Sequence, residues 1–213
     1  MKNLHSCLLF SSLFVLSCAS TSAKPVSFVR VPLTICLINE AGVPTGTVKN
    51  VESRITAMFK ESAVEVRWLN SASSSVNPLD APSCDRLSYP ERLMVHWIPK
   101  SQSTPQEVLG EAFLDEQDAG VKADVFIDHV EAVESEIKVG FPQLLACATS
   151  HEIGHLLLGI NSHSPHGIMQ PHFHGQDLAA IRRGSLGFER GEEQRIHSRL
   201  IGDPLPVLQA VGK

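Results

Sequence analysis

The chain has 213 residues, of which 43% are hydrophobic and 19% are charged, and its formal net charge is −5. This length is enough for one compact domain and leaves little room for a second. The acidic balance excludes the broad basic surface that nucleic-acid-binding domains use, so nucleic acid is not an expected partner.

The N-terminus has the pattern of an export signal. Lys2 precedes an apolar run over residues 8–16, and small residues follow it up to Ala23. The run is too short to cross a bilayer as a helix, so we predict a signal peptide over residues 1–23 and a single domain over residues 24–213. The protein is therefore expected to be exported, as a secreted, periplasmic or lipid-anchored surface protein.

The cysteines agree with export. "VLSC" resembles the bacterial lipobox, whose cysteine becomes lipidated, and Cys18 would then be the anchor; cleavage near Ala23 is the alternative. An oxidising compartment favours pairing of two of the three cysteines beyond the leader. We expect a bridge between Cys36 and Cys84, and a buried structural thiol at Cys147.

The first part of the predicted domain has the pattern of a strand, a helix and a second strand. Residues 33–38 alternate apolar and polar side chains and then turn through Gly42 and Pro44. From Thr47 the apolar residues recur every three or four positions, as an amphipathic helix requires. Residues 64–69 ("VEVRWL") follow as a strand, so a right-handed crossover is expected to place the two strands parallel in one sheet, with the helix on one face.

The middle of the chain predicts a loop and three more strands. Residues 70–90 are rich in Ser, Pro and Asn, which is typical of a surface loop within a domain. The strands are expected within residues 92–99 ("RLMVHWIP"), 109–114 ("LGEAFL") and 123–130 ("ADVFIDHV").

The strongest helix of the chain is expected over residues 141–159. Pro142 suits its first turn and Gly159 suits its C-terminal cap. Helical spacing over residues 192–200 predicts one terminal helix, packed behind the helix of residues 141–159.

Six of the ten histidines lie between His151 and His174. Helical residues four apart share one face, so His151 and His155 can bind one ion, and zinc accepts imidazole nitrogen. Glu152 lies beside the first histidine, where it can accept a proton from water at the metal. A glycine inside a helix costs up to about 1 kcal/mol relative to alanine, so Gly154 indicates that another segment packs closely there.

"HEIGH" followed by Gly159, His163 and "GIM" resembles the metzincin clan of zinc metallopeptidases, whose pattern is H-E-x-x-H-x-x-G-x-x-H or Asp and then a methionine turn. The resemblance covers about residues 151–169. It implies Zn²⁺ as the cofactor, and it implies that Met169 packs beneath the ligands without binding metal. It also implies one α+β domain of zincin type, with a twisted mixed sheet of about four to five strands backed by helices, an active-site helix and a small C-terminal helical part.

The spacing departs from the clan in one place. The strict pattern would put the glycine at Leu158 and the third ligand at Asn161, and asparagine is a poor zinc ligand. We therefore predict His163 as the third ligand, after a turn lengthened by two residues, with Asn161 orienting the ligands. His166 is the competing ligand.

Two further sets of residues leave alternatives open. A different zincin arrangement would take its third ligand from a later helix, where Glu189, Glu192 and Glu193 are the candidates. His172 and His174 are expected to be solvated loop residues, and the alternative is that they form a cleft rim or a second metal site.

The predicted function is a zinc metalloendopeptidase that acts on protein or peptide substrates. In this hypothesis zinc lowers the pKa of bound water toward ~7, and Glu152 removes a proton as the water attacks a peptide carbonyl. Residues 110–115 ("GEAFLD") resemble in position the clan's cleft-edge strand, against which an extended substrate pairs. A membrane would be contacted only through a lipid on Cys18.

Two other functions compete with this one. The first is a zinc-binding surface protein without catalysis, which would have no use for the carboxylate of Glu152. The second is a zinc amidase that acts on cell-wall peptides.

Overall fold

The structure is a computed structural model, and it describes residues 29–70, 92–101, 104–115 and 120–202. Within these residues, five strands and five helices form a single α+β domain. Their order along the chain is β1 (Val31–Asn39), α1 (Thr45–Glu61), β2 (Val64–Asn70), β3 (Arg92–Ile98), β4 (Gly110–Leu114), β5 (Gly120–Phe126), α2 (Ile127–Ile137), α3 (Phe141–Leu158), α4 (Gln176–Arg183) and α5 (Arg190–Leu200).

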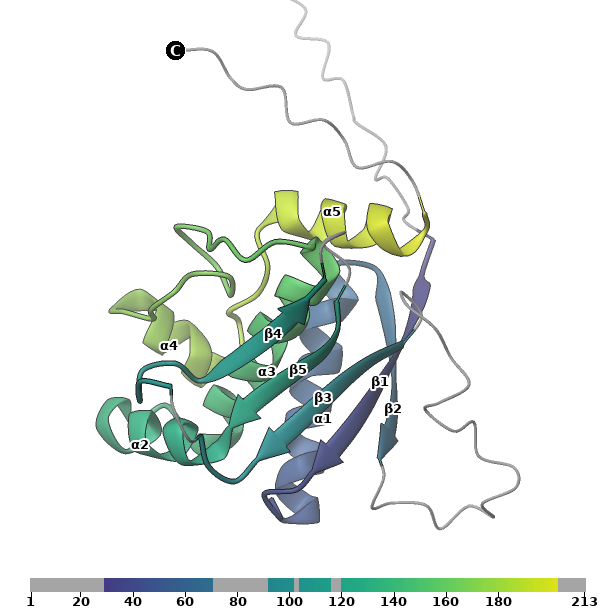
Figure 1. Cartoon of the computed structure of the whole chain (residues 1–213). Coiled ribbons are helices and arrows are strands. Elements are labelled where there is room, and N and C mark those ends of the chain that lie inside the picture. The colour runs from purple at the N-terminus through teal and green to yellow at the C-terminus, as the bar shows by residue number, and fades with distance from the viewer. Residues whose placement is uncertain (1–28, 71–91, 102–103, 116–119, 203–213) are drawn as a thin grey trace, which may run out of the picture.

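The strands form one mixed sheet in the order β2-β1-β3-β5-β4. The pairs β1–β2, β1–β3 and β3–β5 are parallel, whereas β4 runs antiparallel to β5 and forms an edge of the sheet (Figure 1). The predicted mixed sheet of four to five strands is confirmed, and so is the parallel arrangement of the first two strands.

The two faces of the sheet differ in chemistry. In β3, Leu93, Val95 and Trp97 are fully buried, while the alternate residues Arg92 and His96 are only partly buried. The apolar face packs against α1 and α3, which lie behind the sheet in Figure 1. The core therefore lies on one face, and we call the opposite face, which carries His96, the outer face.

The helix α3 lies at the centre of the molecule, in contact with α1, α2, α5 and the strands β4 and β5. It begins with a proline in its first turn and ends at Gly159, whose φ of 64° is left-handed, as predicted for this cap. Almost all of its side chains are buried, which is typical of a helix surrounded by the rest of the fold. Side chains on α3 are therefore held in fixed positions.

Two predictions about the elements are wrong in part. The strand predicted over residues 123–130 ends at Phe126, because α2 begins at Ile127. The apolar spacing of Ile127, Val130, Val133 and Ile137 is helical, and the strand-like residues before it hid this change of period. The C-terminal part contains two helices, α4 and α5, where we predicted one.

The cysteine predictions are tested in part. Cys36 is in a disulfide, and its predicted partner Cys84 lies outside the described residues, so that pairing stays a prediction. Cys147 is free and buried, and burial raises the pKa of its thiol to about 12, which confirms a structural thiol. The predicted signal peptide, the lipidation of Cys18 and the loop over residues 70–90 fall on residues that the structure does not describe, apart from Asn70 at the end of β2. Among the described helices, none has the length and hydrophobicity needed to cross a membrane.

Candidate metal centre

Three histidines converge at the C-terminal half of α3. His151 and His155 lie one turn apart on this helix, and His163 lies in the segment that follows it. One ligand atom from each of the three lies within 4.8 Å of the others, and the ring centroids are 4.7, 5.1 and 5.1 Å apart. We call these three residues the central histidines. His155 is buried and His163 is exposed, so the cluster opens to solvent on one side.

Backbone carbonyls hold two of the rings. The Nδ1 atom of His151 lies 2.8 Å from the carbonyl oxygen of Ile168, and the Nδ1 atom of His155 lies 2.7 Å from that of Ile160. A carbonyl can only accept, so Nδ1 carries the proton in both rings, and a neutral ring then presents a lone pair at Nε2. The two Nε2 atoms face each other 3.1 Å apart.

The surroundings keep the central histidines neutral. Burial lowers the pKa of His151 to about 4, although its bond to the Ile168 carbonyl opposes this shift. Burial also lowers the pKa of His155 and of His163. Neutral imidazoles are the form that a metal ion needs, because protons compete with it for the same nitrogen atoms.

These observations fit a divalent metal ion. Two neutral Nε2 atoms cannot share a hydrogen bond, since neither carries a proton, and their lone pairs repel each other unless a cation lies between them. Nitrogen ligands at ~2.0–2.1 Å from a tetrahedral zinc ion are about 3.3 Å apart. The observed separation of 3.1 Å between the two Nε2 atoms is close to that spacing.

Glu152 lies beside the cluster, buried between α3 and the edge strand. A Cβ atom at Gly110 of β4 would lie 2.7 Å from Cγ of Glu152 and 2.7 Å from the carbonyl oxygen of Asp124, so only glycine fits there. Burial raises the pKa of Glu152 to about 8, and the nearby charge of Glu111 raises it further. The strand β4 therefore passes directly over the carboxyl group of Glu152.

Met169 packs against the helix that carries the central histidines. A Cβ atom at Gly154 would collide with Sδ of Met169 and would lie 2.8 Å from Cε1 of Phe188. Met169 is only 1% exposed. The prediction that another segment packs closely at Gly154 is confirmed, and Met169 is the residue in closest contact.

Two hydrogen bonds of Ser164 hold the segment that carries His163 in place. The backbone N–H of Ser164 donates to the carbonyl of Met169 at 2.9 Å, and its hydroxyl donates to Oε1 of Glu192 on α5. The other carboxylate oxygen of Glu192 accepts from the backbone N–H of Glu189 at 2.8 Å. Glu192 is 2% exposed and therefore links α5 rigidly to the residue that follows His163.

The other candidate residues lie outside the cluster. Within the described residues, the group that can hold a metal contains no glutamate, and Glu189 and Glu192 instead form the capping box of α5. Asn161 is exposed, and the backbone carbonyls described above orient two of the rings.

The remaining three histidines of the segment are exposed and are not members of the cluster. His172 lies close enough to His163 for its charge to add to the lowering of that pKa, after the larger effect of burial. The rings of His172 and His174 are 6.1 Å apart. We call these exposed residues the outer histidines: His166, His172 and His174.

Comparisons with known proteins show the fold of the chain but do not assign it to a family. No protein-family model matches the chain, and no curated protein matches its sequence. Among solved structures, it is similar to archaemetzincin from Methanopyrus kandleri, with a TM-score of 0.50 and 17% identity over 79% of this chain and 96% of that one. The chain shares the fold of archaemetzincin.

A second solved structure is also similar to the chain. It is a zinc-dependent peptidase from Methanocorpusculum labreanum, with a TM-score of 0.43 and 15% identity, and the match covers 69% of this chain and 99% of that one.

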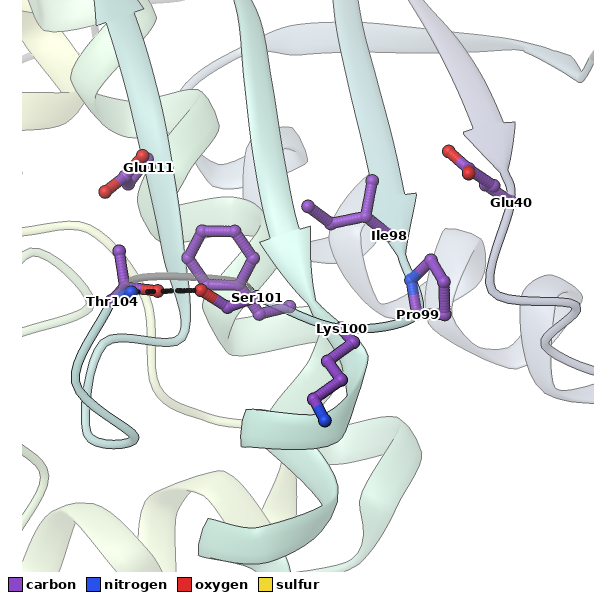
Figure 2. Close-up of a pocket in the computed structure, with 8 residues that line it drawn as sticks. Glu40, Ile98, Pro99, Lys100, Ser101, Thr104 and Glu111 are labelled. Carbon is purple, nitrogen blue, oxygen red and sulfur yellow. Dashed lines mark hydrogen bonds between the residues drawn. The ribbon is translucent and has the colours of Figure 1, made fainter.

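A cavity of about 740 Å³ lies on the outer face of the sheet, near Glu111 (Figure 2). It is formed where β1 and β3 end and where β5 runs into α2, together with the segment after β3. The residues that line it are Glu40, Ile98, Pro99, Lys100, Ser101, Thr104, Glu111 and Phe126.

Sequence reasoning missed three parts of this region: the contact of Gly110 with Glu152, the bond between Ser164 and Glu192, and the cavity. One of them had a signal, because a glycine within a strand pattern often marks a close approach of another group. The bond between Ser164 and Glu192 and the cavity had no signal, because they bring together segments that are distant in sequence.

Proposed function

We propose that this protein is an exported zinc metalloendopeptidase of metzincin type. The observation that carries the proposal is the convergence of three neutral imidazoles beside one buried carboxyl group. The fold shared with archaemetzincin supports it, because that fold is compatible with a peptidase site at this helix.

Zinc is the metal that the donor set favours. Three nitrogen ligands, with one side of the cluster open to solvent, match a catalytic zinc site, whereas a structural site is closed by four protein ligands. His151, His155 and His163 would hold the ion. When bound, it would lower the pKa of a water molecule and polarise the carbonyl group of the substrate.

Glu152 would move the proton during the reaction. Its carboxylate accepts a proton from the attacking water and returns it to the nitrogen of the leaving amine. A general base works best when its pKa lies near the working pH, and burial moves the pKa of Glu152 upward, while a cation at the central histidines would move it back down. The absence of a side chain at Gly110 leaves the space that this carboxyl group occupies beside β4.

The strand β4 would bind the substrate backbone. An edge strand offers unpaired N–H and C=O groups, and an extended peptide can add to it as a further strand. Because Gly110 lies against Glu152, a peptide paired with β4 would bring its own carbonyl groups close to that carboxyl group. Backbone pairing does not depend on a chain end, which favours cleavage within a chain.

Export belongs to the same proposal. It rests on the leader pattern of residues 1–23, with Cys18 as a lipid anchor or with a free mature protein after cleavage.

The proposal can be tested on the purified mature protein. We would measure zinc content and the cleavage of casein, then remove the metal with a chelator and restore it with zinc. The proposal predicts internal peptide products, loss of cleavage after chelation and recovery with zinc.

Two results would replace the proposal with one of its rivals. Stoichiometric zinc with no cleavage of any peptide would favour a binding protein without catalysis. Hydrolysis of purified cell-wall peptides with casein left intact would favour the amidase.

A further inference from the structure

We propose that the β4 end of the cavity accepts the charged tip of a lysine or arginine side chain of the substrate, and that Glu111 selects it. This inference rests on the proposed function, since it concerns a peptide paired with β4. It adds a substrate class to that function.

The alternation of β4 directs its side chains to opposite faces of the sheet. Gly110 pairs with Val125, a fully buried residue of the apolar face, whereas Glu111 pairs with Asp124 and Phe113 pairs with Lys122 on the outer face. A peptide added to β4 would alternate in the same way. Its residue opposite Glu111 would point to the outer face, with its Cβ about 4.5–5.5 Å from that of Glu111.

The end of the cavity that β4 forms carries the carboxylate of Glu111, which suits a cationic side chain. Figure 2 shows Glu111 and Glu40 at its two ends, with Ile98 and Pro99 between them, and Phe126 also lines the cavity. A lysine or arginine residue of the peptide opposite Glu111 can place its charged tip beside the carboxylate of Glu111. A purely apolar side chain would leave that carboxylate without a partner.

Of the two acidic residues that line the cavity, Glu111 is the one available to bind a ligand. Oε2 of Glu40 lies 2.7 Å from Nε2 of His96, and Asp124 on the adjacent strand pairs with Lys122 at 3.1 Å. Glu111 is exposed, and within the described residues its carboxylate has no hydrogen bond or ion pair. Lys100 also lines the cavity, but its side chain extends away from Glu111 in Figure 2.

Glu111 also lies close to the reacting groups. It follows Gly110, where a Cβ atom would lie 2.7 Å from Cγ of Glu152, so a basic side chain held by Glu111 would belong to a residue near the cleaved bond. Glu111 is exposed, so its removal should alter the choice of substrate and leave the fold intact.

The first experiment compares matched peptides on the zinc-loaded mature protein. In a peptide that the wild type cleaves, each of the three residues on either side of the cut is replaced in turn by lysine and by norleucine, which has the same stem without the ammonium group. We expect one position at which lysine gives a kcat/KM roughly fivefold higher than norleucine, the size expected for one ion pair at the surface.

Variants of Glu111 show whether that preference comes from this residue. Glu111→Gln should abolish the preference for lysine, and Glu111→Lys should reverse it in favour of glutamate at the same position. Glu131→Gln is the matched control, since Glu131 is an exposed carboxylate on α2 outside the cavity. The inference is overturned if no position prefers lysine, or if Glu111→Gln retains the preference.

A binding measurement separates this inference from the proposed function. Glu152→Gln, loaded with zinc, is titrated with fluorescent lysine and norleucine peptides, alone and combined with Glu111→Gln. In one outcome, the lysine peptide binds more tightly, this difference depends on Glu111, and the wild type cleaves no peptide. That result would support the selection of a basic side chain by Glu111 and overturn the proposed peptidase function. In the opposite outcome, the wild type cleaves peptides but the two peptides bind equally. That result would support the proposed peptidase function and overturn the selection of a basic side chain by Glu111.

Discussion

The histidines of residues 151–174 fall into two groups that differ in how their rings are held. Among the central histidines, two rings donate Nδ1–H to backbone carbonyls at 2.8 and 2.7 Å, and one ligand atom from each of the three lies within 4.8 Å of the others. The outer histidines are exposed and are not members of this cluster. Both groups come from the same stretch of sequence and contain the same chemical group.

For His151 and His155, burial and anchoring rather than the number of histidines prepare a metal ligand, whereas His163 is exposed and belongs to the central histidines by its position. A ring that is already neutral and fixed in orientation loses little conformational freedom when a metal binds. An exposed ring must lose both its rotamer freedom and any proton it carries. Substitutions among the histidines and the residues around them test this difference between the two groups.

The largest effect is expected from His155→Ala. The variant loses a buried, anchored ligand, so its zinc affinity should fall by more than the ~10- to 100-fold typical of residues that only support ligands. Peptide hydrolysis should be lost with it. Competition with a chelator of known affinity measures the change. His174→Ala is the control, and as a surface substitution it should stay within about twofold of the wild type.

Glu152→Gln should remove activity and leave zinc in place. Loss of a general base typically lowers a rate by about 10²- to 10⁴-fold. Because Glu152 is not part of the histidine cluster, the zinc content of the variant should equal that of the wild type. Single-turnover cleavage of a peptide, beside metal analysis of the same sample, gives both values. A variant that cleaves at the wild-type rate would show that another group moves the proton.

Glu192→Ala should weaken zinc binding from a distance. It removes the bond to Ser164, next to His163, so zinc affinity should fall by roughly tenfold, the lower end for supporting residues. Glu193→Ala is the control on the same helix, and its affinity should match that of the wild type. Equal affinity in the two variants would mean that α5 does not hold His163 in place.

Gly154→Ala should lower the stability of the fold, and its effect on zinc affinity should be smaller. The added methyl group collides with Met169, and overpacking of this kind costs typically ~1–3 kcal/mol of unfolding free energy. Gly191→Ala is the control, because a Cβ there has no neighbour within 4 Å, and alanine should be neutral or stabilising by up to ~1 kcal/mol in a helix. Urea unfolding of both variants measures the difference. A Gly154→Ala protein as stable as the control would contradict the close packing.

Local periodicity predicted most of the fold, because the buried face of each element repeats with a fixed spacing. The strand β1, the helices α1 and α3, and the parallel arrangement of β1 and β2 follow from such patterns. The change from β5 to α2 escaped prediction because the short apolar run of residues 125–127 at this boundary fits both periods.

The site could be predicted only as far as its local spacing reached. His151, Glu152 and His155 lie on one helix, and the spacing of a helix fixes their relation. The other features of the site are tertiary contacts between separate segments. They are the carbonyl groups that hold the rings, the hydrogen bond from Ser164 to Glu192 and the close approach of Gly110 to Glu152. A single sequence read locally can mark a close approach, as Gly110 does, but it does not say which groups meet there.

The most direct test is the zinc content of three proteins after dialysis against metal-free buffer: the wild type, His163→Ala and His166→Ala. We expect about one zinc ion per chain in the wild type and in His166→Ala, and a content far below that in His163→Ala, because three ligands define the site. Full zinc occupancy in His163→Ala, with loss in His166→Ala, would contradict the assignment of the central histidines.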